Sequence, residues 1–110
     1  MANEQHRADH KAFLDDLLGV IPGVKISRAF GYPVYKVNGR IFCFVGGDGV
    51  SIKLPEARVK ALIAERPGWS QLEVSEGTVW REWLSIDHAD SASFADDLPL
   101  FEESISYVAG

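Results

Sequence analysis

Two glycine-bearing turns divide the apolar stretch of residues 30–54 into three short segments, and this pattern constrains the fold more than any other feature. Asn38-Gly39 supplies the two residues with positive φ that a type I′ hairpin turn requires. Residues 46–49 form a second glycine-rich break. This break lacks the lysine of a phosphate-binding loop and precedes a strand rather than a helix, so we interpret it as a hairpin turn. The stretch therefore predicts two consecutive antiparallel hairpins.

The Asn38-Gly39 turn also predicts which side chains share a face of the sheet. It places Val37 opposite Arg40 and, with strict alternation, Tyr35 opposite Phe42. If the second turn closes between Val45 and Val50, one face is aliphatic, and we expect it to be the core. That face carries Val34, Ile41, Cys43, Val45, Val50, Ile52 and Leu54, with Lys36 as a polar exception. The opposite face is then aromatic and basic and carries Tyr35, Val37, Arg40, Phe42, Phe44, Ser51 and Lys53.

The remaining segments predict helices and strands that complete one α+β domain. Apolar side chains at helical spacing predict helices over residues 3–21 and 55–65. Strands are expected at residues 24–30, 70–74 and 79–86, the last with Trp80, Leu84 and Ile86 on one side. Pro99 predicts either a kink in the final helix or a short turn followed by a helix over 99–108. Residues 1–110 suit a single domain.

The charged residues are unevenly distributed around a net charge of −5. Residues 25–66 carry eight basic and three acidic side chains, whereas residues 67–110 carry one basic and nine acidic side chains. One interpretation is that the two segments neutralise each other across the fold. The other is that the basic segment binds an anionic partner.

The single cysteine, Cys43, excludes an intrachain disulfide and a thiolate metal cluster. A reducing, cytoplasmic setting fits this composition best. The first eleven residues are polar and of mixed charge, and no apolar run reaches membrane-spanning length. We therefore expect a cytoplasmic protein with no membrane association.

Four segments in order carry a resemblance to a known family: residues 30–43, 50–54, 83–86 and 104–108. Together they resemble the MmcQ/YjbR-like proteins, and the first segment also resembles the N-terminal domain of TfoX-type competence regulators. The resemblance implies a compact α+β domain with an antiparallel sheet and helices largely on one face. It also implies similarity to the double-wing DNA-binding domain of a phage transcription factor. The family defines no catalytic residues that could be carried over to this chain.

Side chains that often carry chemistry form no catalytic or metal-binding pattern in this sequence. His6 and His10 lie four residues apart, but no glutamate follows His6 as in zinc peptidases. Cys43 is expected to face the core and to be unreactive. The serines lack the G-x-S-x-G context of a nucleophile, and the carboxylates near the tryptophan strand are expected to form a solvated rim. We therefore expect no enzymatic activity, no cofactor and no metal.

The aromatic and basic face is the candidate binding site, through Tyr35, Arg40, Phe42, Phe44 and Lys53. Such side chains are typical both of protein interfaces and of nucleic-acid platforms. A protein partner or a second copy of the chain ranks first, because the acidic C-terminal third repels phosphates. Binding of DNA or RNA is the alternative. A third hypothesis is a small-molecule or enzymatic role in a pocket near Trp69, Trp80 and Trp83.

Overall fold

One antiparallel sheet organises the chain, and its six strands are ordered β1-β2-β3-β4-β6-β5. The computed structural model describes residues 6–110. The strands are β1 (Val24–Ala29), β2 (Tyr32–Val37), β3 (Arg40–Gly46), β4 (Gly49–Lys53), β5 (Ser70–Ser75) and β6 (Thr78–Asp87). The helices are α1 (Ala8–Gly19), α2 (Glu56–Glu65), the 3₁₀ helix η1 (Ser91–Asp97) and α3 (Leu98–Ala109).

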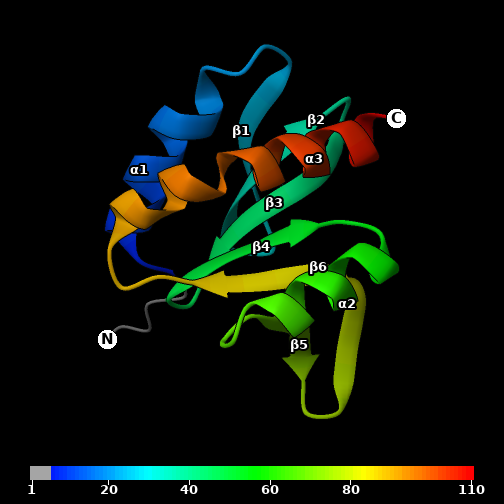
Figure 1. Cartoon of the computed structure of the whole chain (residues 1–110). Coiled ribbons are helices and arrows are strands. Elements are labelled where there is room, and N and C mark those ends of the chain that lie inside the picture. Colours follow the sequence, from blue (N-terminus) through cyan, green and yellow to red (C-terminus); the bar gives the residue numbers. More distant parts are fainter. Residues whose placement is uncertain (1–5) are drawn as a thin grey trace.

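The three α-helices lie on the same side of the sheet and leave its other side without a helix (Figure 1). The core lies between these helices and the sheet. The α+β class expected from the sequence is confirmed. None of the helices described in residues 6–110 is both long and apolar enough to cross a membrane.

Prolines mark where the helices begin and end. Pro22 follows α1, and Pro55 precedes α2 as its N-terminal flanking residue. Pro99 lies in the first turn of α3, where a missing N–H removes no intrahelical hydrogen bond. Of the two outcomes expected for Pro99, the structure therefore shows a short turn, η1, followed by a helix.

The first predicted turn is present, but the register of the hairpin shifts two residues beyond it. Asn38 and Gly39 have φ of 53° and 77°, and Val37 pairs with Arg40 and Lys36 with Ile41, as expected. Tyr35 then pairs with Cys43 rather than with Phe42. Phe42 is therefore an extra residue in β3, a β-bulge.

The second turn is tighter than the sequence suggested. Gly46 pairs with Gly49, so Gly47 and Asp48 alone form the bend. Val45 nevertheless pairs with Val50, as expected, and Cys43 pairs with Ile52 in the same register. Ile41, expected on the core face, lies on the helix-free face of the sheet because of the bulge. Leu54, expected on the same face as Ile41, lies in the core.

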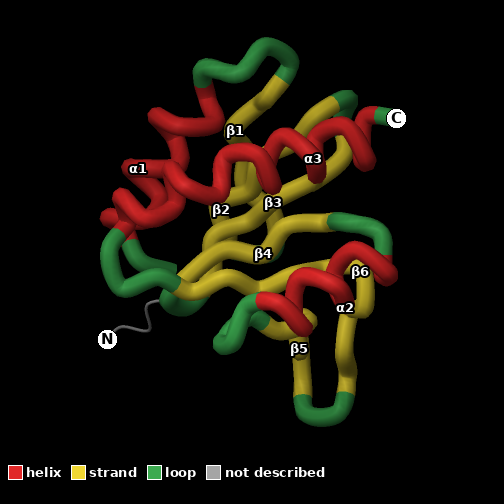
Figure 2. Tube along the Cα trace, viewed as in Figure 1, coloured by secondary structure: helices red, strands yellow, loops and turns green. Residues whose placement is uncertain are grey.

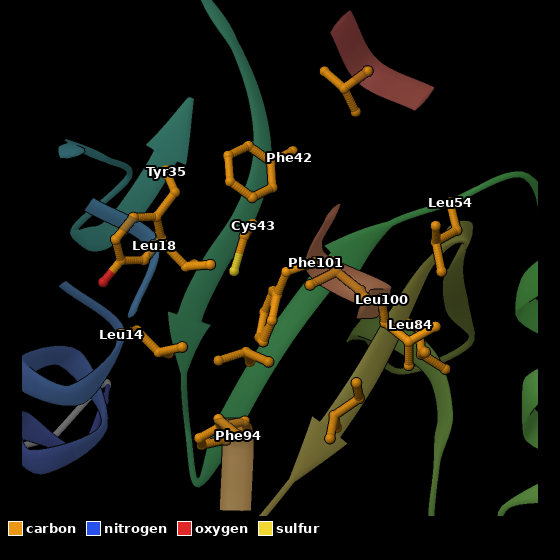
Figure 3. Close-up of a cluster of buried hydrophobic side chains, with 14 of the residues drawn as sticks. Leu14, Leu18, Tyr35, Phe42, Cys43, Leu54, Leu84, Phe94, Leu100 and Phe101 are labelled. Carbon is orange, nitrogen blue, oxygen red and sulfur yellow. The ribbon is translucent and has the colours of Figure 1, made fainter. Parts of the chain in front are cut away.

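Because of the bulge, the distribution of side chains expected for the two faces of the sheet is partly wrong. Tyr35 and Phe42, expected on the outer face, are fully buried in the core, and Val37 is buried beside them. Figure 3 shows Phe42 and the adjacent Cys43 in the same cluster of side chains. A shift of one residue in register reverses the faces of a strand, because side chains alternate with a period of two. The prediction for β4 is correct, and that for β2 is reversed.

Two hydroxyl groups provide the polar contacts that this arrangement requires. Ser104 of α3 is buried and donates a hydrogen bond to the carbonyl oxygen of Lys53 at 2.6 Å. The carbonyl oxygen of Phe42, at the bulge, lies 3.2 Å from the same hydroxyl. The Tyr35 hydroxyl donates to Asp15 Oδ1 in α1 at 2.8 Å, and burial together with this bond raises the pKa of Tyr35. The polar groups that the bulge and Tyr35 bring into the apolar core therefore have hydrogen-bond partners.

Cys43 lies in the core, as the sequence predicted. Its side chain has no exposed surface, and burial raises the pKa of the thiol. Because the thiolate is the nucleophilic form, this cysteine is chemically inert in the folded chain.

Within residues 6–110, a single ion pair joins the basic segment to the acidic one. Arg58 of α2 contacts Glu103 of α3 through two hydrogen bonds, with distances of 2.8 and 3.2 Å. Most basic side chains of residues 25–66 are therefore not neutralised by the acidic segment.

Substitution of Phe42 by alanine tests the corrected orientation. We expect Phe42→Ala to lower the free energy of unfolding by about 3–5 kcal/mol, because it empties a fully buried site. Phe44→Ala is the matched control, since Phe44 lies on the other face and is only half-buried, and its loss should be smaller. Chemical denaturation of both variants provides the measurement. Similar small losses for both would show that Phe42 does not lie in the core.

Candidate binding cleft on the helix-free face of the sheet

A cleft of about 470 Å³ lies on the helix-free face of the sheet. Its floor is a row of cross-strand neighbours that runs over β2, β3, β4 and β6. These neighbours are Val34, Phe44, Ser51 and Ser85. They alternate along their strands with the core residues Tyr35, Cys43, Ile52 and Leu84, which places the cleft and the core on opposite faces.

The walls of the cleft come from the two ends of the sheet. The β1–β2 turn forms one side, and the β5–β6 hairpin forms the other. This hairpin extends away from the rest of the sheet (Figure 2). Its direction follows from an irregular register, in which Gln71 pairs with Leu84 but the next residue, Leu72, pairs with Trp80. Extra residues in one strand bend it, so β6 turns at residues 81–83 and the hairpin lines the cleft.

Trp80 does not lie on the side of β6 expected from the sequence, because the strand bends. The sequence placed Trp80 on the same side as Leu84 and Ile86, which are buried in the core. In the structure Trp80 lines the cleft together with Trp83. Simple alternation fails here because residues 81–83 have no separate partners in β5.

Four aromatic rings form a continuous row across the cleft. The centroid distances are 5.9 Å for Tyr32–Phe44, 5.4 Å for Phe44–Trp83 and 6.3 Å for Trp83–Trp80. These distances lie within the range in which aromatic pairs attract each other. Trp80, at the end of the row, leaves 46% of its surface exposed. The row thus presents aromatic surface to solvent on the helix-free face.

Phe30 lies at the rim of this cleft in an unfavourable conformation. It forms the β1–β2 turn with Gly31, and both residues have positive φ, 54° and 83°. This geometry is that of a type I′ turn, in which bulky residues are rare. The ring is 93% exposed, so burial does not offset the backbone strain. In the Asn38-Gly39 turn, the equivalent position is occupied by Asn38, a residue type that adopts positive φ more readily.

Besides the polar groups of its aromatic side chains, the cleft is lined by two serines and two carboxylates. Ser51 and Ser85 lie on the floor with their hydroxyl oxygens 3.3 Å apart, so each hydroxyl has the other as a partner. Glu73 of β5 and Asp87 of β6 line the rim. Glu73 Oε2 accepts a hydrogen bond from Gly77 N at 3.0 Å and stabilises the β5–β6 turn. The charged side chains that line the cleft are thus both acidic.

A second hollow, the basic hollow, lies on the other side of Trp83. Its cationic lining consists of Lys36, Arg40 and Lys53, and Trp83 belongs to the lining of both hollows. Lys25 lies directly opposite Lys36 in the β1–β2 register. In the part of the chain described, residues 6–110, none of these four side chains forms an ion pair. Like charges that face each other across a sheet are destabilising, so this arrangement is an electrostatic cost to the fold.

The candidate site predicted from the sequence is divided among three places. Phe44 lies in the cleft, and Arg40 and Lys53 lie in the basic hollow. Tyr35 and Phe42 lie in the core and present no surface to a partner. Of the residues in the aromatic row, only Phe44 was expected on this face from the sequence. One sequence feature could have indicated this site. Phe30-Gly31 has the form of a two-residue hairpin turn, but an aromatic residue stands where Asn or Gly is usual.

The three tryptophans of the pocket hypothesis do not share one pocket. Trp80 and Trp83 line the cleft, whereas Trp69 packs against the core cluster. The guanidinium carbon of Arg66 lies 4.6 Å from the centroid of the Trp69 ring, in a cation–π contact.

The histidine pair considered as a metal site is not arranged as expected. α1 begins at Ala8, so His6 and His10 do not share a helical face. His10 is fully buried, with Nδ1 2.6 Å from Ser91 Oγ and Nε2 2.9 Å from the His88 carbonyl oxygen. Both ring nitrogens therefore have partners and link α1 to the segment before η1. Residues 6–110 contain no group of three or more side chains suited to hold a metal ion.

Comparisons of the chain with protein-family models, with curated proteins and with solved structures find no match. The resemblance to the MmcQ/YjbR-like proteins therefore stays a prediction from the sequence segments that carry it.

Replacement of Phe30 by asparagine tests whether phenylalanine at this position lowers the stability of the folded chain. We expect Phe30→Asn to raise the free energy of unfolding by about 1 kcal/mol, because asparagine adopts positive φ more readily than phenylalanine. Phe30→Ala is the control, since alanine removes the ring but leaves the strained backbone, and it should give little or no gain. Urea denaturation measures both variants. A loss of stability in Phe30→Asn would mean that the ring stabilises the folded chain.

Proposed function

We propose that this chain is a non-catalytic binding module that takes up a segment of a partner protein in the aromatic cleft. The observation that carries the proposal is the exposed aromatic lining, in which Phe30 is kept almost fully in solvent at a cost in backbone strain. Strain of this kind is typical of functional positions. The proposal places the module in the cytoplasm, where a lone cysteine such as Cys43 stays reduced.

The shape and composition of the cleft favour insertion of side chains over contact with a flat surface. Its volume of about 470 Å³ lies within the range of small-ligand pockets. Aromatic side chains, above all tryptophan and tyrosine, contribute most of the binding energy in many protein interfaces. A peptide that places apolar side chains among Tyr32, Phe44 and Trp83 would bury aromatic surface that the fold leaves exposed.

Selection from a displayed library of random peptides tests this proposal. We expect the wild-type chain to enrich a related set of peptides, and Trp80→Ala to weaken their binding by about tenfold or more, since it removes an exposed ring of the row. Phe30→Asn should also weaken binding although it stabilises the fold. Val20→Ser is the matched control, because Val20 is an exposed apolar residue that follows α1 and does not line the cleft.

Two outcomes would contradict the proposal. One is the absence of any enriched peptide, and the other is a set of peptides whose binding is unchanged in Trp80→Ala. Light scattering of the wild-type chain completes the test. A dimer that dissociates in Trp80→Ala would make a second copy of the chain, rather than another protein, the occupant of the cleft.

Nucleic-acid binding is a second candidate, and the basic hollow is the observation that favours it. Lys25, Lys36, Arg40 and Lys53 form no ion pair within residues 6–110, and Trp83 lies beside them. Trp83 is partly buried, and cations next to an accessible aromatic ring are typical of single-strand binding surfaces. Glu73 and Asp87 at the rim of the cleft oppose it, because their charges repel phosphates.

Titration of a labelled single-stranded oligonucleotide at two salt concentrations measures this activity. If the basic hollow binds phosphates, affinity for the oligonucleotide falls steeply as salt increases. Lys36→Gln should then reduce the slope of log affinity against log salt concentration by about 1, the value expected for one lost phosphate contact. Lys60→Gln is the control, since Lys60 pairs with Glu56 on α2. Absence of binding at low salt would eliminate this candidate.

A further inference from the structure

The charge of the cleft distinguishes it from the rest of the helix-free face. Glu73 and Asp87 are the charged side chains of its lining, and no lysine or arginine of residues 6–110 belongs to that lining. The basic hollow shares Trp83 with the cleft and is also lined by Tyr107 and Val108 of α3. The cleft therefore combines negative charge with aromatic surface, whereas its neighbour combines positive charge with the same tryptophan.

Aromatic rings and carboxylates attract the same kind of ligand. The face of an aromatic ring carries partial negative charge, and ammonium and guanidinium groups bind to it within about 6 Å of the centroid. A nearby carboxylate adds direct attraction, which strengthens where water is partly excluded. Anionic ligands are repelled by both groups, and neutral ligands gain only the apolar contact.

The chain itself contains one example of this contact. Arg66 lies over the ring of Trp69, 4.6 Å from its centroid. No such cation from residues 6–110 occupies the aromatic row, although four rings are available there. The row thus lacks the internal cation that Trp69 has.

We infer that the cleft binds an organic cation on an apolar stem, such as the ammonium group of a lysine or methylated lysine side chain in the partner segment. This inference rests on the proposed function, since it names the chemistry that the partner presents. The ammonium group lies against the faces of Trp80 and Trp83, and Glu73, which follows Leu72, the strand partner of Trp80, balances its charge. Asp87 lies at the other end of β6, opposite Gly49, and adds only longer-range attraction. The apolar stem contacts Phe44 and Val34 on the floor.

Choline and its neutral isostere 3,3-dimethyl-1-butanol test the inference, because they have the same shape and differ in charge. Binding is followed through the indole N–H resonances in ¹⁵N NMR spectra, with Trp69 as the internal reference outside the cleft. We expect choline to shift the resonances of Trp80 and Trp83 but not that of Trp69. We expect its affinity to exceed that of the isostere by about tenfold.

Variants of the two carboxylates identify the source of this preference. Glu73→Gln keeps an oxygen that accepts the hydrogen bond from Gly77, so it removes the charge without opening the turn. We expect Glu73→Gln to weaken choline by about threefold and to leave the isostere unchanged. Asp87→Asn should weaken choline less, because Asp87 lies opposite Gly49 at the far end of β6. Asp96→Asn, an exposed acid of η1, is the matched control and should change neither affinity.

The outcomes separate this inference from the proposed function. Equal affinities for choline and the isostere, or no binding of choline while selected peptides still bind, would overturn the cation preference alone. If neither peptides nor choline bind the cleft, both the inference and the proposed function are wrong. A preference for choline that is unchanged in Glu73→Gln would also overturn the role assigned to Glu73.

Discussion

The bulge at Phe42 determines how the rest of the structure divides its side chains. One extra residue in β3 turns both Phe42 and Cys43 toward the helices and aligns Tyr35 with them. It also turns Ile41 to the other side of the sheet. The Ser104 hydroxyl of α3 donates to the Lys53 carbonyl at the end of β4 and lies 3.2 Å from the carbonyl oxygen at this bulge, so one polar group of α3 contacts both strands. Leu100, Phe101 and Val108 of the same helix pack in the core that Tyr35 and Phe42 enter.

A second irregularity, in β6, gives the helix-free face its shape. The bend at residues 81–83 brings Trp80 beside Trp83 and carries the β5–β6 hairpin along one side of the cleft. Without it, the sheet would present a flatter surface with fewer rings. The two bulges thus have different consequences: the first fills the core with aromatic residues, and the second assembles those that remain into a concave site.

The distribution of charge follows from the same arrangement. Only Arg58 and Glu103 join the basic and acidic segments by an ion pair within residues 6–110. In the part of the chain that the structure describes, Lys36, Arg40 and Lys53 are therefore left without ion-pair partners in the basic hollow, and Glu73 and Asp87 line the cleft. Trp83 belongs to the lining of both hollows. A surface of opposite charges joined by aromatic rings suits a partner with an ordered pattern of charges better than a uniformly charged polymer.

The sequence by itself determined the class of the fold, the Asn38-Gly39 turn, the approximate bounds of the helices and strands, and the faces of β4. These features depend on neighbours along the chain, such as the positive φ of a turn or the spacing of apolar residues. Only the tertiary structure decided the faces of β2, the position of Phe42 and the composition of the cleft. A bulge depends on how a strand pairs with a particular partner, and that pairing is not visible in local periodicity. Of the five residues predicted for the site, Phe44, Arg40 and Lys53 consequently reach the helix-free face or its edge, while Tyr35 and Phe42 stabilise the core.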